Sequence, residues 1–437
     1  SSCCESSKLR LATRLPRCQA LPMTDTLKVA IIGAGLGGLT LAKTLLHEDS
    51  GRPVEVCIYE AWDHWKVRGG ALGLAAGARI LEKLGLKAQL AAVANDIHGF
   101  EMHFHSNGSE LNSLNIPGCT AMRRDLQKLL VESMPSSVIK LNHKLIEIIE
   151  GEDEVVLEFE NGARASAHLV VASDGIHSFV RQKIFGVDQP EFTGFRVLYS
   201  ISSKPYRPDP KVAHIHWKEA DGSGYGLLDL TAGQGDLRHD ICVMIMRSED
   251  HVTDQWDSTM AKERFQELAA KVGPDHPVLS KAVEMCEVCF DWGIYKQPTR
   301  KSWISNKGRV VLLGDAAHAT APFMGQGANM AMHDAYCLGQ ILQNDKISLH
   351  DGVQLYETSR KAFCESIVSK SSMVGRMHTA TGFKASFRDK FLCFFLLRNM
   401  KQIVTTDPTA KKPWDQQSSF FQHLGKKIQR FCSRSPF

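Results

Sequence analysis

The glycine-rich stretch GAGLGG at residues 33–38 constrains the fold of this chain more than any other feature. It follows the apolar run LKVAII, opens a helical pattern, and precedes a second apolar strand that ends in Glu60. A GxGxxG in that setting is the fingerprint of a Rossmann-type dinucleotide site. Gly33 permits the tight turn, Gly35 lets a pyrophosphate approach the backbone at the helix N-terminus, and Gly38 lets helix and strand pack closely. Glu60 can accept hydrogen bonds from ribose hydroxyls, and an acid here favours NAD or FAD over NADP.

A second stretch rich in small residues, GDAAHATAPFMGQGANMAMHDA at 314–335, lies far downstream. It follows the apolar run GRVVLL and leads into a helix that begins near Gly327. Asp315, at the end of the strand, suits the hydroxyls of a ribityl chain. Gly325 and Ala328 can present bare backbone N–H groups to the edge of a flavin ring, where the helix dipole would stabilise negative charge. A plain NAD-dependent dehydrogenase needs no such second motif, so the pair favours FAD.

The pattern of apolar residues predicts an α/β protein with more than one domain. At 437 residues the chain is too long for one compact core. Period-2 and period-3.6 segments indicate a Rossmann-like FAD-binding domain, an inserted β-rich substrate domain and a C-terminal helical tail. The expected boundaries are a disordered leader at 1–24, an FAD-binding domain at 25–190 and 299–378, a substrate domain at 191–298 that 95–118 joins, and a basic tail at 379–437.

The positive charge of the chain is concentrated at its two ends. The net charge is +4, yet residues 384–437 alone carry eleven Lys or Arg against three Asp, so the body between the ends is acidic. This distribution excludes a nucleic-acid interface, which would need a basic stripe on the body.

The cysteines and the terminal segments bear on location. The twelve cysteines are scattered, which is typical of reduced thiols in a cytoplasmic protein. Cys286 and Cys289 form a lone CxxC without a second pair, so we predict no metal site. Residues 1–22 are rich in Ser and Arg, so a transit peptide is the alternative to the cytoplasm, which we favour. We interpret FLCFFLL at 391–397 as a helix packed on the body, with a membrane-surface helix as the alternative.

Three motifs in this order give the chain a specific resemblance. It resembles the FAD-dependent aromatic-ring hydroxylases, the single-component (group A) flavoprotein monooxygenases, over about residues 28–378. The motifs are the GxGxxG, a DG motif in ASDGIHSFVR with Asp174 and Arg181, and the GD motif at 314–335. The segment VRGGALGLAAGARILEKLGL is more similar to tetracycline-inactivating than to salicylate-hydroxylase-like members. The resemblance implies this set of FAD-binding residues: Gly33, Gly35, Gly38, Glu60, Gly73, Arg123, Asp174, Asp315, Gly325 and Ala328.

The resemblance also implies a reaction. NADPH or NADH would reduce FAD, O₂ would add to the flavin, and a C4a-hydroperoxide would transfer one oxygen atom to a small aromatic or polycyclic substrate. The protein would act as a monomer or homodimer. Lys66 and Arg68 are candidates for contact with the phosphates of NAD(P)H, the alternative being solvated surface cations. Arg196, early in the β-rich domain, is the candidate catalytic residue, because it could orient a substrate hydroxyl or carboxylate; a structural role is the alternative.

Two other functions remain open at this point. The same fold supports flavin oxidoreductases that do not activate O₂, and substrate-dependent oxygen consumption separates them from monooxygenases. The Rab-escort (GDP-dissociation inhibitor) family resembles the fold without binding flavin, and its members would be colourless. The GD motif argues against that second alternative. We interpret His318 within this motif as a packing or hydrogen-bonding residue rather than a base.

Overall fold

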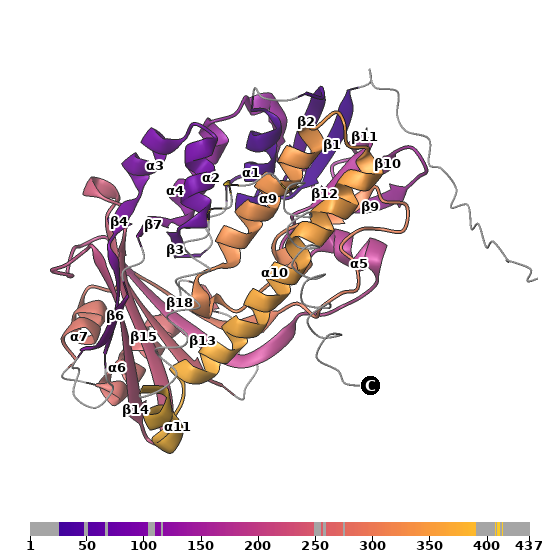
Figure 1. Ribbon diagram of the computed structural model, residues 1–437. Coiled ribbons are helices and arrows are strands. Elements are labelled where there is room, and N and C mark those ends of the chain that lie inside the picture. The colour runs from indigo at the N-terminus through magenta and orange to yellow at the C-terminus, as the bar shows by residue number, and fades with distance from the viewer. Residues whose placement is uncertain are drawn as a thin grey trace, which may run out of the picture.

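A computed structural model gives the arrangement of the chain (Figure 1). It describes residues 26–389 except 48–50, 66–68, 104–109, 115–116, 249–254, 257–258 and 274–275, together with 407, 409–410 and 413. The expected leader, the pair Lys66 and Arg68, and the tail segment 391–397 therefore lie outside the described residues. No helix within the described ranges is both long and apolar enough to cross a bilayer.

A five-stranded parallel sheet forms the centre of the first region. Its strand order is β19-β12-β1-β2-β8, and every neighbouring pair is parallel. The apolar runs seen in the sequence supply these strands, because a parallel sheet is covered on both faces and needs apolar side chains on both. The strands are β1 (Leu27–Ile32), β2 (Val54–Tyr59), β8 (Ile139–Lys140), β12 (Leu169–Ala172) and β19 (Val310–Leu312).

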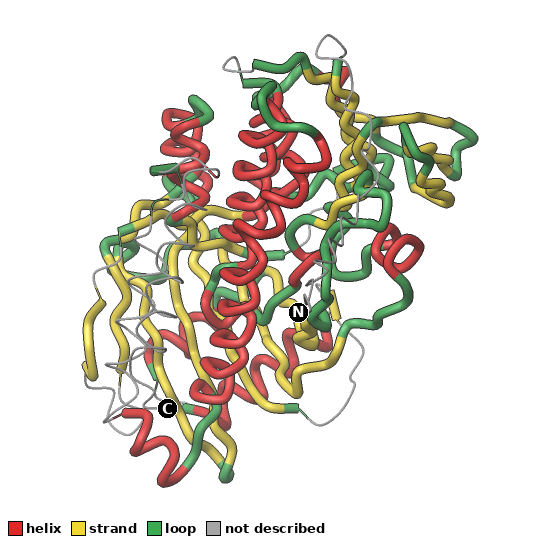
Figure 2. The backbone as a smooth tube through the Cα atoms, turned by 45° about the vertical axis from the view of Figure 1, so that its right-hand side comes forward, coloured by secondary structure: helices red, strands yellow, loops and turns green. Residues whose placement is uncertain are grey.

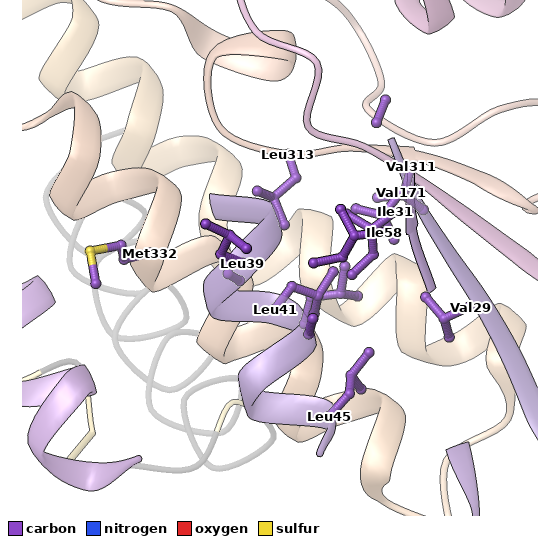
Figure 3. Close-up of a cluster of buried hydrophobic side chains, with 14 of the residues drawn as sticks. Val29, Ile31, Leu39, Leu41, Leu45, Ile58, Val171, Val311, Leu313 and Met332 are labelled. Atoms are coloured by element: carbon purple, nitrogen blue, oxygen red, sulfur yellow. The ribbon is translucent and has the colours of Figure 1, made fainter. Parts of the chain in front are cut away.

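Helices cover this sheet and bury its main core. Helix α1 (Leu36–Leu45) follows the glycine turn and packs against α9 (Gly327–Gln343). The two helices approach closely because Gly339 has no side chain: a Cβ there would lie 2.5 Å from the Cγ2 of Thr44. Figure 3 shows leucines of α1 pointing toward apolar side chains of β1, β2, β12 and β19.

Two small antiparallel sheets and several short helices flank the parallel sheet. One sheet is a meander of β9 (Leu145–Glu150), β10 (Val155–Phe159) and β11 (Arg164–Ala167). The other has the order β3 (Ala71–Leu74), β7 (Gly118–Met122) and β4 (Asn95–Ile97). The remaining helices of this region are α2 (Ala76–Lys83), α3 (Lys87–Val93), α4 (Arg123–Glu132) and α5 (Phe179–Phe185).

The second region is built on an eight-stranded sheet with one parallel pair. Its strands come from two stretches of sequence, since β5 and β6 precede α4 whereas the others follow α5. All neighbours are antiparallel except β14 and β5. The order is β17 (Gln255–Trp256), β18 (Val288–Lys296), β13 (Glu191–Ser202), β16 (His239–Arg247), β15 (Ser223–Ala232), β14 (Val212–Ala220), β5 (Gly99–His103) and β6 (Glu110–Leu114).

The two faces of this sheet pack against different elements. Helices α6 (Thr259–Val272) and α7 (Pro277–Glu284) cover one face around Phe265. The other face packs on the short 3-10 helix η3 (Pro322–Met324) and on α10 (Leu349–His378). Helix α10 has 30 residues, about 45 Å of helix, and runs from the first region across the second (Figures 1 and 2). This architecture confirms the predicted α/β class with a Rossmann-like parallel sheet and a separate β-rich region.

Candidate flavin site

The glycine turn between β1 and α1 has the geometry that its sequence predicts. Gly33 has a φ of +99°, and a Cβ there would lie 2.7 Å from the carbonyl oxygen of Ser173. A Cβ on Gly38 would lie 2.3 Å from the oxygen of Gly33, so helix and turn meet without room for a side chain. Gly35 is the N-cap of α1, where the first N–H groups have no partner within the helix. These free N–H groups at a helix N-terminus suit a pyrophosphate.

Glu60 lies directly over this turn. Its Oε2 accepts a hydrogen bond from the N–H of Ala34 at 2.8 Å, and its Oε1 accepts one from the N–H of Trp62 at 3.2 Å. Gln127 of α4 donates to the carbonyl oxygen of Ala34 at 2.9 Å. The structure therefore brings Glu60 to the fingerprint glycines, as the sequence predicts, while its contact with a ribose stays a prediction.

The DG motif connects the early turn with the late motif. Asp174 lies in the loop between β12 and α5 and accepts a hydrogen bond from the N–H of Val180 at 3.2 Å, while burial raises the pKa of its carboxyl. Arg181 is almost completely buried and reaches across to the GD segment. Its Nη1 donates to the oxygen of Ala316 at 3.0 Å, and its Nη2 donates to the oxygen of Pro298 at 2.9 Å. Arg181 thus holds the first turn of the GD motif in place.

In the GD motif, the residues predicted to contact FAD are accessible. Asp315 is the first residue of the short helix α8 (Asp315–His318), is exposed, and forms no hydrogen bond within the described chain. Gly325 has a φ of +61° and ends η3 just before α9 begins at Gly327. A Cβ placed on Gly325 or on Gly73 would meet no atom within 4 Å. Open backbone beside a helix N-terminus fits a flat, partly anionic ring, so these residues fit FAD.

Asn329 connects the segment 73–77 with Gly325, just before α9, a role that the sequence analysis missed. It is 2% exposed and forms four hydrogen bonds to backbone. Its Oδ1 accepts from the N–H groups of Ala75 and Gly77 at 3.1 and 3.0 Å. Its Nδ2 donates to the oxygens of Gly73 and Gly325 at 2.8 and 3.1 Å. Asn329 therefore joins β3 and α2 to the start of α9. The sequence feature that could have indicated this role is an Asn two residues inside a predicted helix.

A buried ion cluster lies beneath α8. Asp334 accepts from the Nε2 of His318 at 2.5 Å, from the Nε of Arg360 at 2.8 Å, and from the N–H of Gly314 at 3.3 Å. Burial alone would raise the pKa of Asp334, but His318 and Arg360 lower it. Burial alone would lower the pKa of His318, but the nearby Cys364 and Asp334 raise it well above its ordinary value. His318, Asp334 and Cys364 offer ligand atoms that lie within 4.8 Å of one another, and the carboxylate of Asp334 is already paired with His318 and Arg360.

The start of β3 contacts both the start of α4 and strand β13 of the eight-stranded sheet. Arg123 is exposed, and its N–H donates to the oxygen of Gly70 at 3.0 Å. Tyr199 of β13 packs against the same glycine, since a Cβ on Gly70 would lie 2.2 Å from the Cε1 of Tyr199. The Tyr199 hydroxyl accepts from the N–H of Ala71 at 2.7 Å. Tyr199 thus fixes the sheet to the strand that carries Gly73.

Arg196 lies on the other face of β13. It is completely buried, and its Nε donates to Asp291 at 3.0 Å, while Arg264 of α6 binds the second oxygen of Asp291 at 2.9 Å. Successive side chains of a strand alternate between faces, so Arg196 and Tyr199 point in opposite directions. The structure therefore argues against the predicted role of Arg196 in orienting a substrate: it lies away from Gly73 and pairs with Asp291.

The face that carries Tyr199 is apolar. Tyr199 stacks on Trp292 with ring centroids 5.8 Å apart, and both belong to the cluster that packs the sheet against Phe323 and Met324 of η3. Leu228 of β15 is half-buried on the same face. This apolar face of the sheet packs against η3, and Gly325 follows η3 directly in the chain.

Comparisons with known proteins agree with this geometry. The chain matches the family described as "FAD binding domain" over residues 26–371. It is 27% identical over 381 residues to 3-amino-4-hydroxybenzoate 2-monooxygenase of Streptomyces platensis, covering 83% of this chain and 91% of that protein.

Solved structures share the fold. The crystal structure of Klebsiella pneumoniae HpxO with FAD and uric acid superposes with a TM-score of 0.75 at 19% identity, covering 87% of this chain and 97% of that one. A salicylate hydroxylase in complex with its substrate superposes with a TM-score of 0.71 at 21% identity, covering 88% and 97%. These comparisons confirm the resemblance and the cofactor that the motifs predict: the chain belongs to the FAD-binding-domain family of aromatic-hydroxylating monooxygenases, and it is an FAD-dependent monooxygenase.

Proposed function

We propose that this protein uses NADPH or NADH to insert one oxygen atom from O₂ into a small, electron-rich aromatic or polycyclic molecule. The observation that carries the proposal is that three groups of unpaired polar or open backbone positions occur beside one apolar face of the eight-stranded sheet. These features are the free N–H groups of the early turn, the exposed carboxylate of Asp315 and the open backbone at Gly73 and Gly325. Helix α1 packs on α9, and Asn329 of α9 binds the oxygens of Gly73 and Gly325. The Tyr199 hydroxyl accepts from the N–H of Ala71 beside them.

Each of these features suits one part of FAD. The turn that contains Gly33 and Gly35 would hold the pyrophosphate, and Glu60 would accept hydrogen bonds from the ribose beside the one it accepts from Ala34. Asp315 would bind hydroxyls of the ribityl chain. The first N–H groups of α9, with the positive end of its dipole, would stabilise negative charge at the ring edge. When bound, FAD supplies the redox chemistry: it accepts a hydride and activates O₂.

The protein's own contribution is orientation and exclusion of water. A substrate ring held against Tyr199, Trp292 and Leu228 would contact apolar and aromatic surface rather than solvent, which protects a reactive oxygen donor from water. Relatives whose names include 3-amino-4-hydroxybenzoate and 6-hydroxynicotinate act on aromatic rings that carry electron-donating groups. This supports an aromatic substrate here without naming it.

The test uses the purified, flavin-loaded protein. We expect a yellow protein that oxidises NADPH or NADH faster when the right member of a panel of phenols, polyketides and terpenoids is added. Oxygen consumption should rise in step, and hydrogen peroxide should remain low with a well-coupled substrate. Substrate-dependent NAD(P)H oxidation without O₂ uptake would instead indicate a flavin oxidoreductase. A colourless protein that refuses added FAD would contradict the assignment altogether.

A further inference from the structure

A pocket lies where α10 ends. This end of α10 is at the side of the β-rich region away from the parallel sheet (Figure 1). The pocket has a volume of about 870 Å³ and is bounded by the turn between β14 and β15, the ends of β16 and α10, one side of α6, and the short helix α11 (Gly382–Phe387). We call it the α11 pocket. None of its lining residues belongs to the three flavin motifs, and the reaction proposed above does not use it.

The α11 pocket has a strongly basic lining. Its ionised side chains are all cations, namely Arg247, Arg264, Arg376, Lys384 and Arg388. Three of them have partners: Arg264 pairs with Asp291, Arg388 pairs with Asp389, and Arg247 donates to the hydroxyl of Thr379. Arg376 and Lys384 are exposed, and neither has an acidic partner within the described residues. Glu219 accepts from the N–H of Gly382 at 3.1 Å at the start of α11, so acid is present beside the pocket, but it pairs with neither Arg376 nor Lys384.

Large apolar side chains are exposed at the same place. Phe383 is 85% exposed, Phe387 is 46% exposed, and Met373 of α10 is 38% exposed. Phe383 and Phe387 are four residues apart on α11, so they lie on the same side of that helix. Exposed aromatic groups beside Lys and Arg are typical of surfaces that enter the boundary between lipid headgroups and acyl chains.

The charge of the whole chain would orient this face toward a negative surface. The body at residues 23–383 holds more Asp and Glu than Lys and Arg, so most of it would be repelled by anionic lipid, whereas the α11 end would be attracted. We propose that the surface around the α11 pocket docks on an anionic membrane. Phe383 and Phe387 would enter the lipid interface, and Arg376 and Lys384 would contact headgroup phosphates.

Vesicle flotation of the full-length, flavin-loaded protein tests the proposal. The probes are vesicles of phosphatidylcholine alone and of phosphatidylcholine with phosphatidylserine. We expect binding to the anionic vesicles only, and a fall in apparent affinity of about tenfold for Phe383→Ser, because one phenyl group no longer leaves water. Lys384→Glu should weaken binding at least as much. Val187→Ser is the matched control, since Val187 is 73% exposed but lies outside the pocket lining, and it should bind as the wild type does.

Flavin content and thermal midpoint should be the same for all three variants, which shows that each is folded. Equal binding to neutral and anionic vesicles would overturn the charge argument, and no binding to either would overturn the proposal. Anionic-vesicle binding that Phe383→Ser and Lys384→Glu leave unchanged would assign the contact to residues beyond 389 and overturn it too. Binding of monomeric dodecyl phosphate without any vesicle binding would make the pocket a site for a soluble amphiphile instead.

Discussion

Replacing Asn329 by Ala should separate the flavin site into two loosely connected halves. The change removes hydrogen bonds to two N–H groups, of Ala75 and Gly77, and to two carbonyl oxygens, of Gly73 and Gly325. A buried group left without a partner costs about 1–3 kcal/mol, and a solvent-accessible group costs little because water replaces the partner. Of the residues that carry these groups, Gly77 is buried, Ala75 and Gly73 are half-buried, and Gly325 is exposed. We therefore expect the free energy of unfolding to fall by about 3 kcal/mol.

The loss of FAD affinity in Asn329→Ala should be larger than the loss of folding stability alone would cause. Without Asn329, Gly73 and Gly325 are no longer held at a fixed separation, so binding must order them, and we expect the Kd for FAD to rise at least about tenfold. Urea unfolding of the apoprotein measures the first effect, and quenching of FAD fluorescence on titration measures the second. Asn329→Asp keeps acceptor oxygens for Ala75 and Gly77 but turns a carboxylate oxygen toward the carbonyl oxygens of Gly73 and Gly325, so it should be no more stable than the Ala variant.

Gln343→Ala is the matched control, because it removes a buried amide from the opposite end of the same helix. The Nε2 of Gln343 donates to the oxygens of Thr44, Leu45 and His47 at 2.8, 3.4 and 3.2 Å, and none of these residues belongs to the flavin motifs. This variant should lose stability while keeping its affinity for FAD. If Asn329→Ala and Gln343→Ala lose stability and FAD affinity in the same proportion, Asn329 has no particular role at the flavin site.

Three further changes test other parts of the molecule. Asp315→Ala should lose FAD during purification, and full flavin content measured from the absorption spectrum would exclude its proposed contact with the ribityl chain. Glu60→Ala should weaken FAD more than NAD(P)H, and a raised KM for NAD(P)H at unchanged flavin content would contradict this. Burial and the nearby Arg388 lower the pKa of His378 to about 4, and its neutral Nδ1 accepts a hydrogen bond from Trp217. The unfolded chain therefore takes up this proton first as the pH falls below about 6.5, so urea unfolding should show about 2 kcal/mol less stability at pH 5 than at pH 7. His378→Gln should flatten that dependence, and an unchanged slope would show that other groups cause it.

The motifs whose geometry depends on neighbouring residues could be predicted from the sequence. Gly33 must adopt a positive φ and Gly38 must accept the backbone of the turn, and both requirements follow from a strand–turn–helix at that spacing. The break at Gly325 before a helix follows from the same local rules. Such features involve few residues close in sequence, so no knowledge of the tertiary fold is needed.

The connections between motifs could not be predicted in the same way. Arg181 and Ala316 are 135 residues apart, and Asn329 and Gly73 are 256 residues apart. An Arg in a helix or an Asn at the start of one is compatible with many partners, and only the strand order β19-β12-β1 determines which of them come close. The sequence thus supplied candidate FAD contacts, whereas the residues that hold those segments together were found only in the structure.

The contrast between Arg196 and Tyr199 shows where strand patterns stop being informative. Alternation assigns the two residues to opposite faces of β13, and this much follows from their odd separation. Which face meets the flavin region depends on what covers the sheet. Phe265 of α6 packs on the Arg196 side and Phe323 of η3 packs on the Tyr199 side, and both helices carry apolar residues. A charged residue in a strand otherwise rich in apolar residues looks functional, but here the ion pair of Arg196 with Asp291, whose second oxygen pairs with Arg264, accounts for it. Because a buried Arg needs a carboxylate wherever it lies, charge within a strand indicates a partner before it indicates a substrate.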